Sequence, residues 1–177
     1  MHRLPEEKRG LMNRRSAQIW IYFISFLIFA ADRVSKYFIT HNLPAAKSVS
    51  VIPNFFHLTL VTNKGAAFGI LKDISGLSII MTILAIALII LYVYRSRSVT
   101  IAVASALGLI LGGAMGNLAD RVRFGYVIDF LDFRIWPVFN IADSAISAGA
   151  AILILSIFSN VKAKSGTSSN IKKQISR

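Results

Sequence analysis

The chain has 177 residues, 55% of them hydrophobic, with 20 lysines and arginines, eight acidic residues and no cysteine. This length suits one domain, and the lack of cysteine excludes disulfides, thiol nucleophiles and thiolate metal sites. The net charge of +12 invites a nucleic-acid partner, but the basic residues flank long apolar runs, which indicates a membrane protein with no nucleic-acid partner.

Four apolar runs are long enough to cross a bilayer, which takes roughly 20 residues. They lie at about 17–39, 77–94, 99–119 and 141–158. We therefore predict an α-helical integral membrane protein with a membrane domain at 16–160, a basic tail at 1–15 and a basic, disordered tail at 161–177. The first run also has the form of a secretory signal ending at Ala30-Ala31, but the apolar pattern resumes at 37–39, which favours an uncleaved helix.

The distribution of basic residues predicts the orientation. Twelve lysines and arginines flank the runs on the side that carries both termini, against eight in the longer connections on the other side. Because basic residues concentrate on the cytoplasmic side of a membrane, both termini are expected there. The basic tails are expected to meet anionic lipid headgroups.

The two long connections on the outer side have strand-like patterns. In 47–62, Val49 and Val51 alternate with polar residues, as do Leu58 and Leu60, and Pro53-Asn54 lies between the two stretches. This pattern predicts two short strands joined by a turn. Residues 66–74 are apolar and compact, which suggests a short helix in the membrane interface. The second connection, 124–139, is rich in aromatic and β-branched residues and is expected to be extended.

Carboxylates are the least expected feature of so apolar a chain. A charged side chain inside a membrane is costly, so it is normally paired, buried among helices, or functional. Five aspartates lie at or beyond the outer ends of the apolar runs: Asp32, Asp120, Asp129, Asp132 and Asp143. An acid-dependent site is therefore expected at the outer membrane surface.

The first and third runs offer a structural explanation for their aspartates. Asp32 and Lys36 are four residues apart, the spacing of a helical ion pair, and they could equally serve structure or substrate binding. Asp120 is followed by Arg121, which could neutralise it. Asn117 shares a helix face with Asp120.

Glycines also recur on the third run. Gly108, Gly112 and Gly116 follow one another at four-residue spacing. Such spacing lets a second helix approach closely, so these glycines are interpreted as a packing face.

The remaining aspartates lie around the start of the fourth run. Asp143 stands three residues after Asn140, as in a helix start with Asn140 as the N-cap, which accounts for it without catalysis. Asp129 interrupts an apolar stretch and has no such explanation. Asp132 poses the same problem but has Arg134 nearby as a possible partner.

The bend at Trp136-Pro137 could bring Asp129 and Asp143 together. Two neighbouring carboxylates that share a proton can activate a water and protonate a carbonyl oxygen, which is aspartyl protease chemistry and needs no cofactor. The parts of other proteases are missing: no histidine accompanies Ser144 in the sequence, and the zinc motif H-E-x-x-H is absent.

Two other kinds of protein remain as alternatives. A proton- or ion-coupled transporter could use membrane-embedded aspartates as a relay, but would place them near the midplane. A non-catalytic membrane scaffold could keep the glycine face and would need no carboxylate pair.

Taken together, these residues resemble the lipoprotein signal peptidases (signal peptidase II), a family of bacterial membrane aspartyl proteases. Five blocks carry the resemblance, in the order that the family has them. They are DRVSK at 32–36, NKGAAFG at 63–69, GGAMGNLADR at 112–121, VIDF at 127–130 and FNIADS at 139–144.

The resemblance implies a role for each matched residue. It makes Asp129 and Asp143 the catalytic pair and leaves Asp132 outside it. It makes Asn63, Asn117, Arg121 and Asn140 residues that line the site and hold substrate or the antibiotic globomycin. Asp32, Lys36 and Asp120 take supporting roles.

It also implies the fold and the substrate. The fold would be four transmembrane helices with a small extracytoplasmic β-sheet cradle and a short interfacial helix. The substrate would be a diacylglyceryl-modified prolipoprotein, cut just before its lipidated cysteine. We further expect a monomer in the bacterial inner membrane, without cofactor or metal, with its active site at the extracytoplasmic surface.

Overall fold

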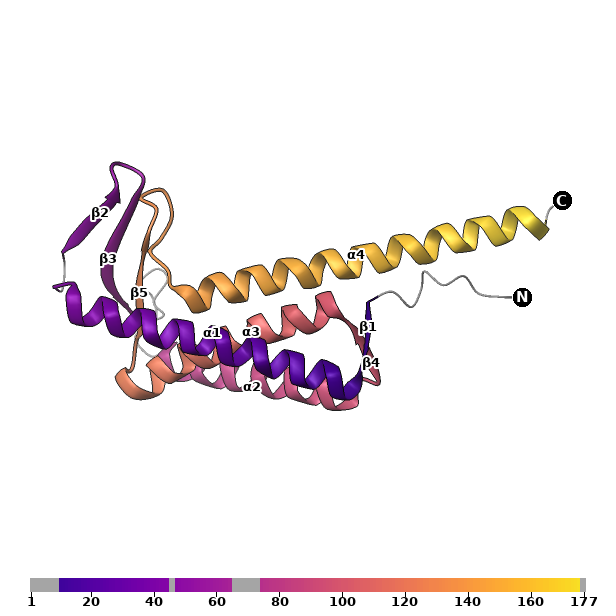
Figure 1. Ribbon diagram of the computed structural model, residues 1–177, viewed down its shortest axis with the longest axis horizontal. Helices are drawn as coiled ribbons and strands as arrows, with labels where there is room; N and C mark the ends of the chain where they lie inside the picture. Colours follow the sequence, from indigo (N-terminus) through magenta and orange to yellow (C-terminus); the bar gives the residue numbers. More distant parts are fainter. Residues whose placement is uncertain (1–9, 45–46, 65–73, 176–177) are drawn as a thin grey trace.

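A computed structural model describes residues 10–44, 47–64 and 74–175. The interfacial helix expected at 66–74 lies almost wholly outside these residues. Figure 1 shows long helices running side by side, with a small sheet at one end of them.

Within the described residues, four helices are long and apolar enough to span a membrane, as predicted. They are α1 (Arg14–Asn42), α2 (Ile74–Arg95), α3 (Ile101–Phe124) and α4 (Ile141–Ile175). Capping residues mark several of their ends: the side chains of Asn13 and Thr100 accept N–H bonds at the starts of α1 and α3, and Gly125 ends α3 in the left-handed conformation at φ 77°.

α4 differs from the expectation for the C-terminal tail. A disordered segment was expected from residue 161, whereas α4 continues as helix to Ile175. Each added residue of an existing helix contributes one hydrogen bond, and no proline follows Pro137 to interrupt it. The candidate membrane span within α4 covers Ile141–Ser159 among the residues searched.

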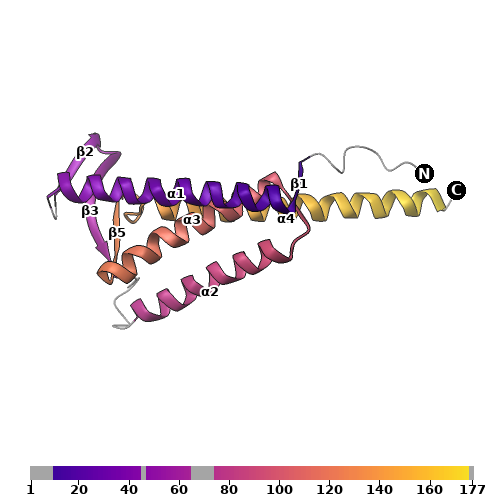
Figure 2. The same ribbon diagram turned by 60° about the horizontal axis from the view of Figure 1, so that its bottom comes forward.

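α3 is the central helix because its glycines admit two neighbours. A Cβ on Gly112 would lie 2.5 Å from the backbone oxygen of Ser25 on α1, and a Cβ on Gly113 would lie 2.5 Å from the backbone oxygen of Ala142 on α4. The interpretation of the glycines as a packing face is therefore confirmed. Figure 2 shows α3 between α2 on one side and α1 and α4 on the other.

The sheet at the end of the bundle has three antiparallel strands in the order β2-β3-β5. They are β2 (Ser48–Ile52), β3 (Phe56–Asn63) and β5 (Val127–Asp132). β2 and β3 are the predicted pair, joined by a turn in which Asn54 has φ 60°. β5 lies in the connection that was expected to be extended, and five of its six residues, 127–130 and Asp132, are buried.

A second, two-stranded sheet was not predicted. β1 (Leu11–Asn13) pairs antiparallel with β4 (Ser98–Thr100) at the opposite end of the bundle. Strands of three residues carry too little alternation to be recognised from sequence. This sheet holds the start of α1 beside the start of α3.

Candidate active site

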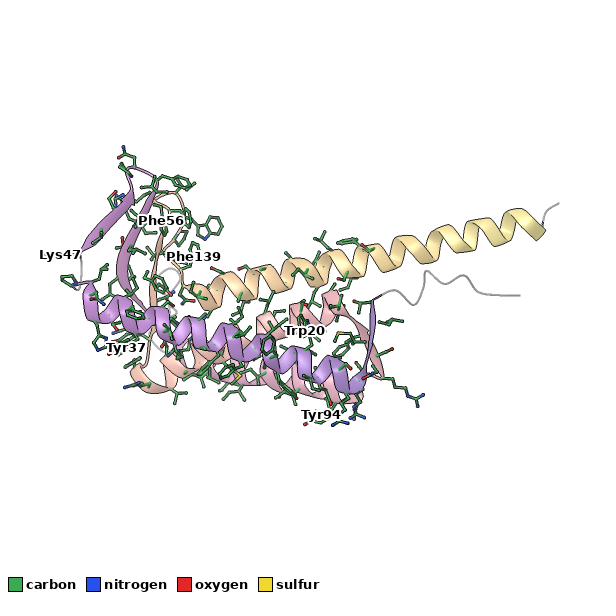
Figure 3. The ribbon with its side chains drawn as sticks, viewed as in Figure 1. Trp20, Tyr37, Lys47, Phe56, Tyr94 and Phe139 are labelled. Carbon is green, nitrogen blue, oxygen red and sulfur yellow. The ribbon has the colours of Figure 1, made fainter. Side chains whose placement is uncertain are left out.

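The loop after β5 folds back on the strand and so positions Asn140. Phe139 accepts the N–H groups of Phe130 and Leu131 at 2.9 and 2.8 Å, and donates its own N–H to Leu131 at 3.1 Å. The ring of Phe139 stacks on that of Phe133, which in turn contacts Phe56 of β3; Figure 3 labels Phe56 and Phe139 in this cluster. The reversal places Asn140, which is fully buried, next to Asp129 on β5.

Asn140 begins α4 as the predicted N-cap. Its Oδ1 accepts the Asp143 N–H at 2.9 Å, and the carboxylate of Asp143 accepts the Asn140 N–H at 3.3 Å. This reciprocal pair of bonds satisfies two backbone donors at the helix start and fixes the Asp143 side chain there.

Asp129 is almost completely buried, with 1% exposure. Asn140 Nδ2 donates to its Oδ1 at 2.6 Å, and Asn63 Nδ2, from the neighbouring strand β3, donates to its Oδ2 at 3.0 Å. Burial and the charge of Asp143 raise the pKa of Asp129, and the bonds from Asn63 and Asn140 and the charge of Lys36 oppose the rise; the net pKa is about 6. A proton on Asp129 is thus held at a pH where an exposed aspartate has lost it.

Two asparagines connect Asp129 with Asp143. Asn117 Nδ2 donates to Asp143 Oδ1 at 2.7 Å, and Asn117 Oδ1 accepts from Asn140 Nδ2 at 3.1 Å. Because Asn140 also donates to Asp129, the two carboxylates belong to one hydrogen-bond network. Residues from α3, α4 and β5 supply its members.

A buried ion cluster lies beside this network. Lys36 Nζ is 3.0 Å from Asp32 and 2.7 Å from Asp120, and Arg33 is 2.6 and 2.7 Å from the same two carboxylates. The predicted ion pair of Asp32 with Lys36 is therefore confirmed. The third hydrogen of Lys36 goes to Asn117 Oδ1 at 3.3 Å, which joins the cluster to the carboxylate network.

The ion cluster also connects α1, α3, α4 and β5. Asp32 on α1 accepts the N–H of Ala142 at the start of α4 at 3.2 Å, and Asp120 on α3 accepts the N–H of Ile128 on β5 at 3.1 Å. Asp32 and Asp120 are both 0% exposed. Each of these carboxylates is paired and hydrogen-bonded, as buried charges must be.

The prediction that Arg121 neutralises Asp120 is wrong. Asp120 pairs with Arg33 and Lys36 of α1, and Arg121 has no carboxylate within 4.0 Å among the described residues. Consecutive residues on a helix point about 100° apart, so Arg121 cannot share the buried face of Asp120. Sequence reasoning missed Arg33, although its position next to Asp32 in the outer part of the first run was a usable signal.

Asp132 lies outside the carboxylate network. It accepts a bond from Thr59 Oγ1 at 2.8 Å and pairs with Arg134 at 3.3 Å. These bonds lower the pKa of Asp132, the one from Thr59 most. The expectation that Arg134 is its partner is confirmed.

Comparison with known proteins gives one consistent family. The family model described as Signal peptidase (SPase) II matches residues 24–159. A lipoprotein signal peptidase of Halothermothrix orenii is 44% identical over 142 residues, covering 80% of this chain and 97% of that protein. One of Moorella thermoacetica is 50% identical over 131 residues, covering 73% and 87%.

Two solved structures, both described as a bacterial membrane enzyme determined by the in meso method, share the fold. The 2.3 Å structure superposes with a TM-score of 0.75 at 32% identity, covering 81% of this chain and 90% of its own. The 1.9 Å structure gives 0.73 at 33% identity, covering 77% and 91%. The family match covers most of α1, all of α2 and α3, the three-stranded sheet and both carboxylates, and it therefore places this chain in the signal peptidase II family of aspartic proteases.

Proposed function

We propose that this chain removes the signal peptide from diacylglyceryl-modified prolipoproteins by cutting just before the lipidated cysteine, with Asp129 and Asp143 as the catalytic pair. The observation that carries the proposal is the hydrogen-bond network that joins these two carboxylates through Asn117 and Asn140. The transporter alternative has no support from the family match, and the aspartates lie at one end of the bundle rather than at its middle.

The environments of the two carboxylates support different roles for them in this proposal. Asp129, whose raised pKa lets it keep a proton to a higher pH than an exposed aspartate, is the acid. Asp143, which accepts N–H donors from Asn117 and from the Asn140 backbone, is the base. Two neighbouring carboxylates that share one proton are the arrangement that aspartyl proteases use.

The reaction then needs only the pair and a water. Asp143 takes a proton from the water while the water oxygen attacks the peptide carbonyl carbon, and Asp129 gives its proton to the carbonyl oxygen. The tetrahedral intermediate collapses as the C–N bond breaks: the proton on Asp143 passes to the leaving nitrogen, and the hydroxyl proton returns to Asp129.

The surrounding residues take supporting roles in this proposal. Asn63, Asn117 and Asn140 orient the carboxylates, and Asp32, Lys36 and Asp120 hold the elements that carry them. Arg121 makes no ion pair within the described residues and stays a prediction as a substrate contact.

The protein belongs to the bacterial inner membrane, as its four apolar helices and its family indicate. We infer from the basic residues that both termini are cytoplasmic and that the carboxylate pair faces the extracytoplasmic side. We also infer that the chain works as a monomer, because its own residues supply the whole network.

The test is cleavage of a prolipoprotein by the purified protein in detergent. A substrate carrying diacylglyceryl on its cysteine should yield a product that begins at that cysteine, as read by mass spectrometry. The same substrate with serine in place of that cysteine cannot be lipidated and should remain intact. Cleavage elsewhere, or loss of cleavage on adding a chelator, would rule out the proposal.

A further inference from the structure

A groove outside the carboxylate network opens between the outer ends of α1 and α3. It has a volume of about 660 Å³, and none of Asp129, Asp143, Asn117 and Asn140 lines it. Its apolar wall includes Val34, Tyr37 and Phe38 of α1, Phe124 of α3 and Ile128 of β5. Tyr37 is labelled in Figure 3 near the end of α1 that bounds the groove.

The polar part of the groove carries an excess of positive charge. Arg33 and Lys36 line it, but Asp32 and Asp120 balance them. Arg123 also lines it, is exposed, and has no carboxylate within 4.0 Å among the described residues. Its guanidinium lies 5.1 Å from the ring of Phe124, so a cation and an aromatic face stand together at the groove.

Arg33 provides a donor that the described residues leave unused. Its Nη1 and Nη2 bond to Asp120, Asp32 and the Gly116 carbonyl, whereas its Nε is buried and finds no acceptor in the described part of the chain. A buried N–H without an acceptor is unfavourable. An anionic oxygen that enters the groove beside Arg33 would supply that acceptor after a small movement of the guanidinium.

We propose that this groove binds an anionic phospholipid, whose phosphate lies between Arg33 and Arg123 and whose acyl chains lie along Val34, Tyr37, Phe38 and Phe124. Basic pockets between transmembrane helices bind anionic headgroups, and aromatic side chains at helix ends lie at the level of the headgroups. The surplus cation favours a lipid with a net negative charge over a zwitterionic one. The proposal does not depend on the peptidase reaction.

The experiment measures lipid retention by native mass spectrometry of the purified, delipidated protein in detergent. Phosphatidylglycerol should bind about fivefold more tightly than phosphatidylcholine, the effect of one interfacial cation. Arg123→Gln should abolish that preference. Arg97→Gln removes another exposed cation, between α2 and α3, and should keep the preference.

A second pair of variants tests the acyl-chain part of the groove without changing charge. Val34→Trp should fill the groove and weaken phosphatidylglycerol binding at least fivefold. Ile19→Trp, at an exposed position on α1 that does not line the groove, should have no effect. Unfolding temperatures of all four variants check that each is folded.

Competition experiments separate the lipid from related ligands. Glycerol 3-phosphate, which carries the phosphate without acyl chains, should not displace phosphatidylglycerol, and neutral diacylglycerol should displace it poorly. Equal binding of the two phospholipids, equal behaviour of each variant and its control, or efficient displacement by either competitor would overturn the proposal.

Discussion

At the scale of single residues, the hydrogen-bond donors around Asp129 lower its pKa and so affect the pH at which it loses its proton. Burial raises its pKa to about 6, and the bond from Asn63 opposes that rise because it stabilises the ionised form. Loss of the last proton from the pair removes the acid, so kcat/KM should fall as the pH rises through the apparent pKa of the pair.

Asn63→Ala should therefore move this alkaline limb to higher pH, by about one unit, the size expected for loss of one hydrogen bond to a charged group. The measurement is kcat/KM against pH for a lipid-modified substrate. Asn42→Ala, which removes an exposed amide from the end of α1, serves as the control and should leave the profile unchanged. A limb that stays in place or moves to lower pH in Asn63→Ala would contradict the assignment of Asp129 as the acid.

Arg33 and Arg121 offer a second comparison between single residues. Arg33→Gln leaves two fully buried carboxylates with one cation, and loss of a partner from a buried pair costs about 3 kcal/mol. Arg121→Gln breaks no ion pair within the described residues and should change stability by less than about 0.5 kcal/mol. Unfolding in mixed micelles with added denaturing detergent gives both values; similar losses for the two variants would refute the pairing.

Local spacing determines how much of the site could be predicted. The pair Asp32–Lys36 and the cap Asn140–Asp143 are contacts within one helix, so their spacing alone was sufficient. Arg33 with Asp120 and Asn117 with Asp143 join different helices. Such contacts depend on how the helices pack, which no local pattern encodes.

At the scale of elements, the close approach of α1 to α3 depends on glycine. A Cβ on Gly112 would lie 2.5 Å from a backbone oxygen of α1, so Gly112→Ala must push the helices apart, at about 1–3 kcal/mol. Gly76, near the start of α2, has nothing within 4 Å of such a Cβ, and Gly76→Ala should be neutral or stabilising by up to about 1 kcal/mol. The same unfolding assay measures both, and a stable Gly112→Ala protein would contradict the packing.

The sequence indicated that the glycines of α3 form a packing face, but not which helices pack against it. Gly112 contacts α1 and Gly113 contacts α4, although the two are adjacent. The strands β2 and β3 were predictable from alternation and a turn, since they form a local hairpin. The pairing of β3 with β5 joins segments far apart in the chain, and sequence alone offered only the extended character of β5.

At the scale of the whole molecule, the distribution of basic residues predicts which end of the bundle meets the cytoplasm. Reporter fusions at Ser48 and Arg134, in the two connections that contain the three-stranded sheet, should be extracytoplasmic. A fusion at Ser96, between α2 and α3, should be cytoplasmic. An extracytoplasmic reporter at Ser96 would invert the proposed orientation and place the carboxylate pair on the wrong side of the membrane.

Catalysis by Asp129 and Asp143 is the central claim, and cleavage of a diacylglyceryl prolipoprotein by purified variants tests it most directly. Asp129→Asn and Asp143→Asn keep the size of each side chain but remove the acid or the base. Each should abolish turnover, and the double variant should be no worse than either, because members of one catalytic unit fail together. Asp132→Asn, outside the network, should keep most activity. Substantial turnover by a folded Asp129→Asn or Asp143→Asn protein would contradict the assignment.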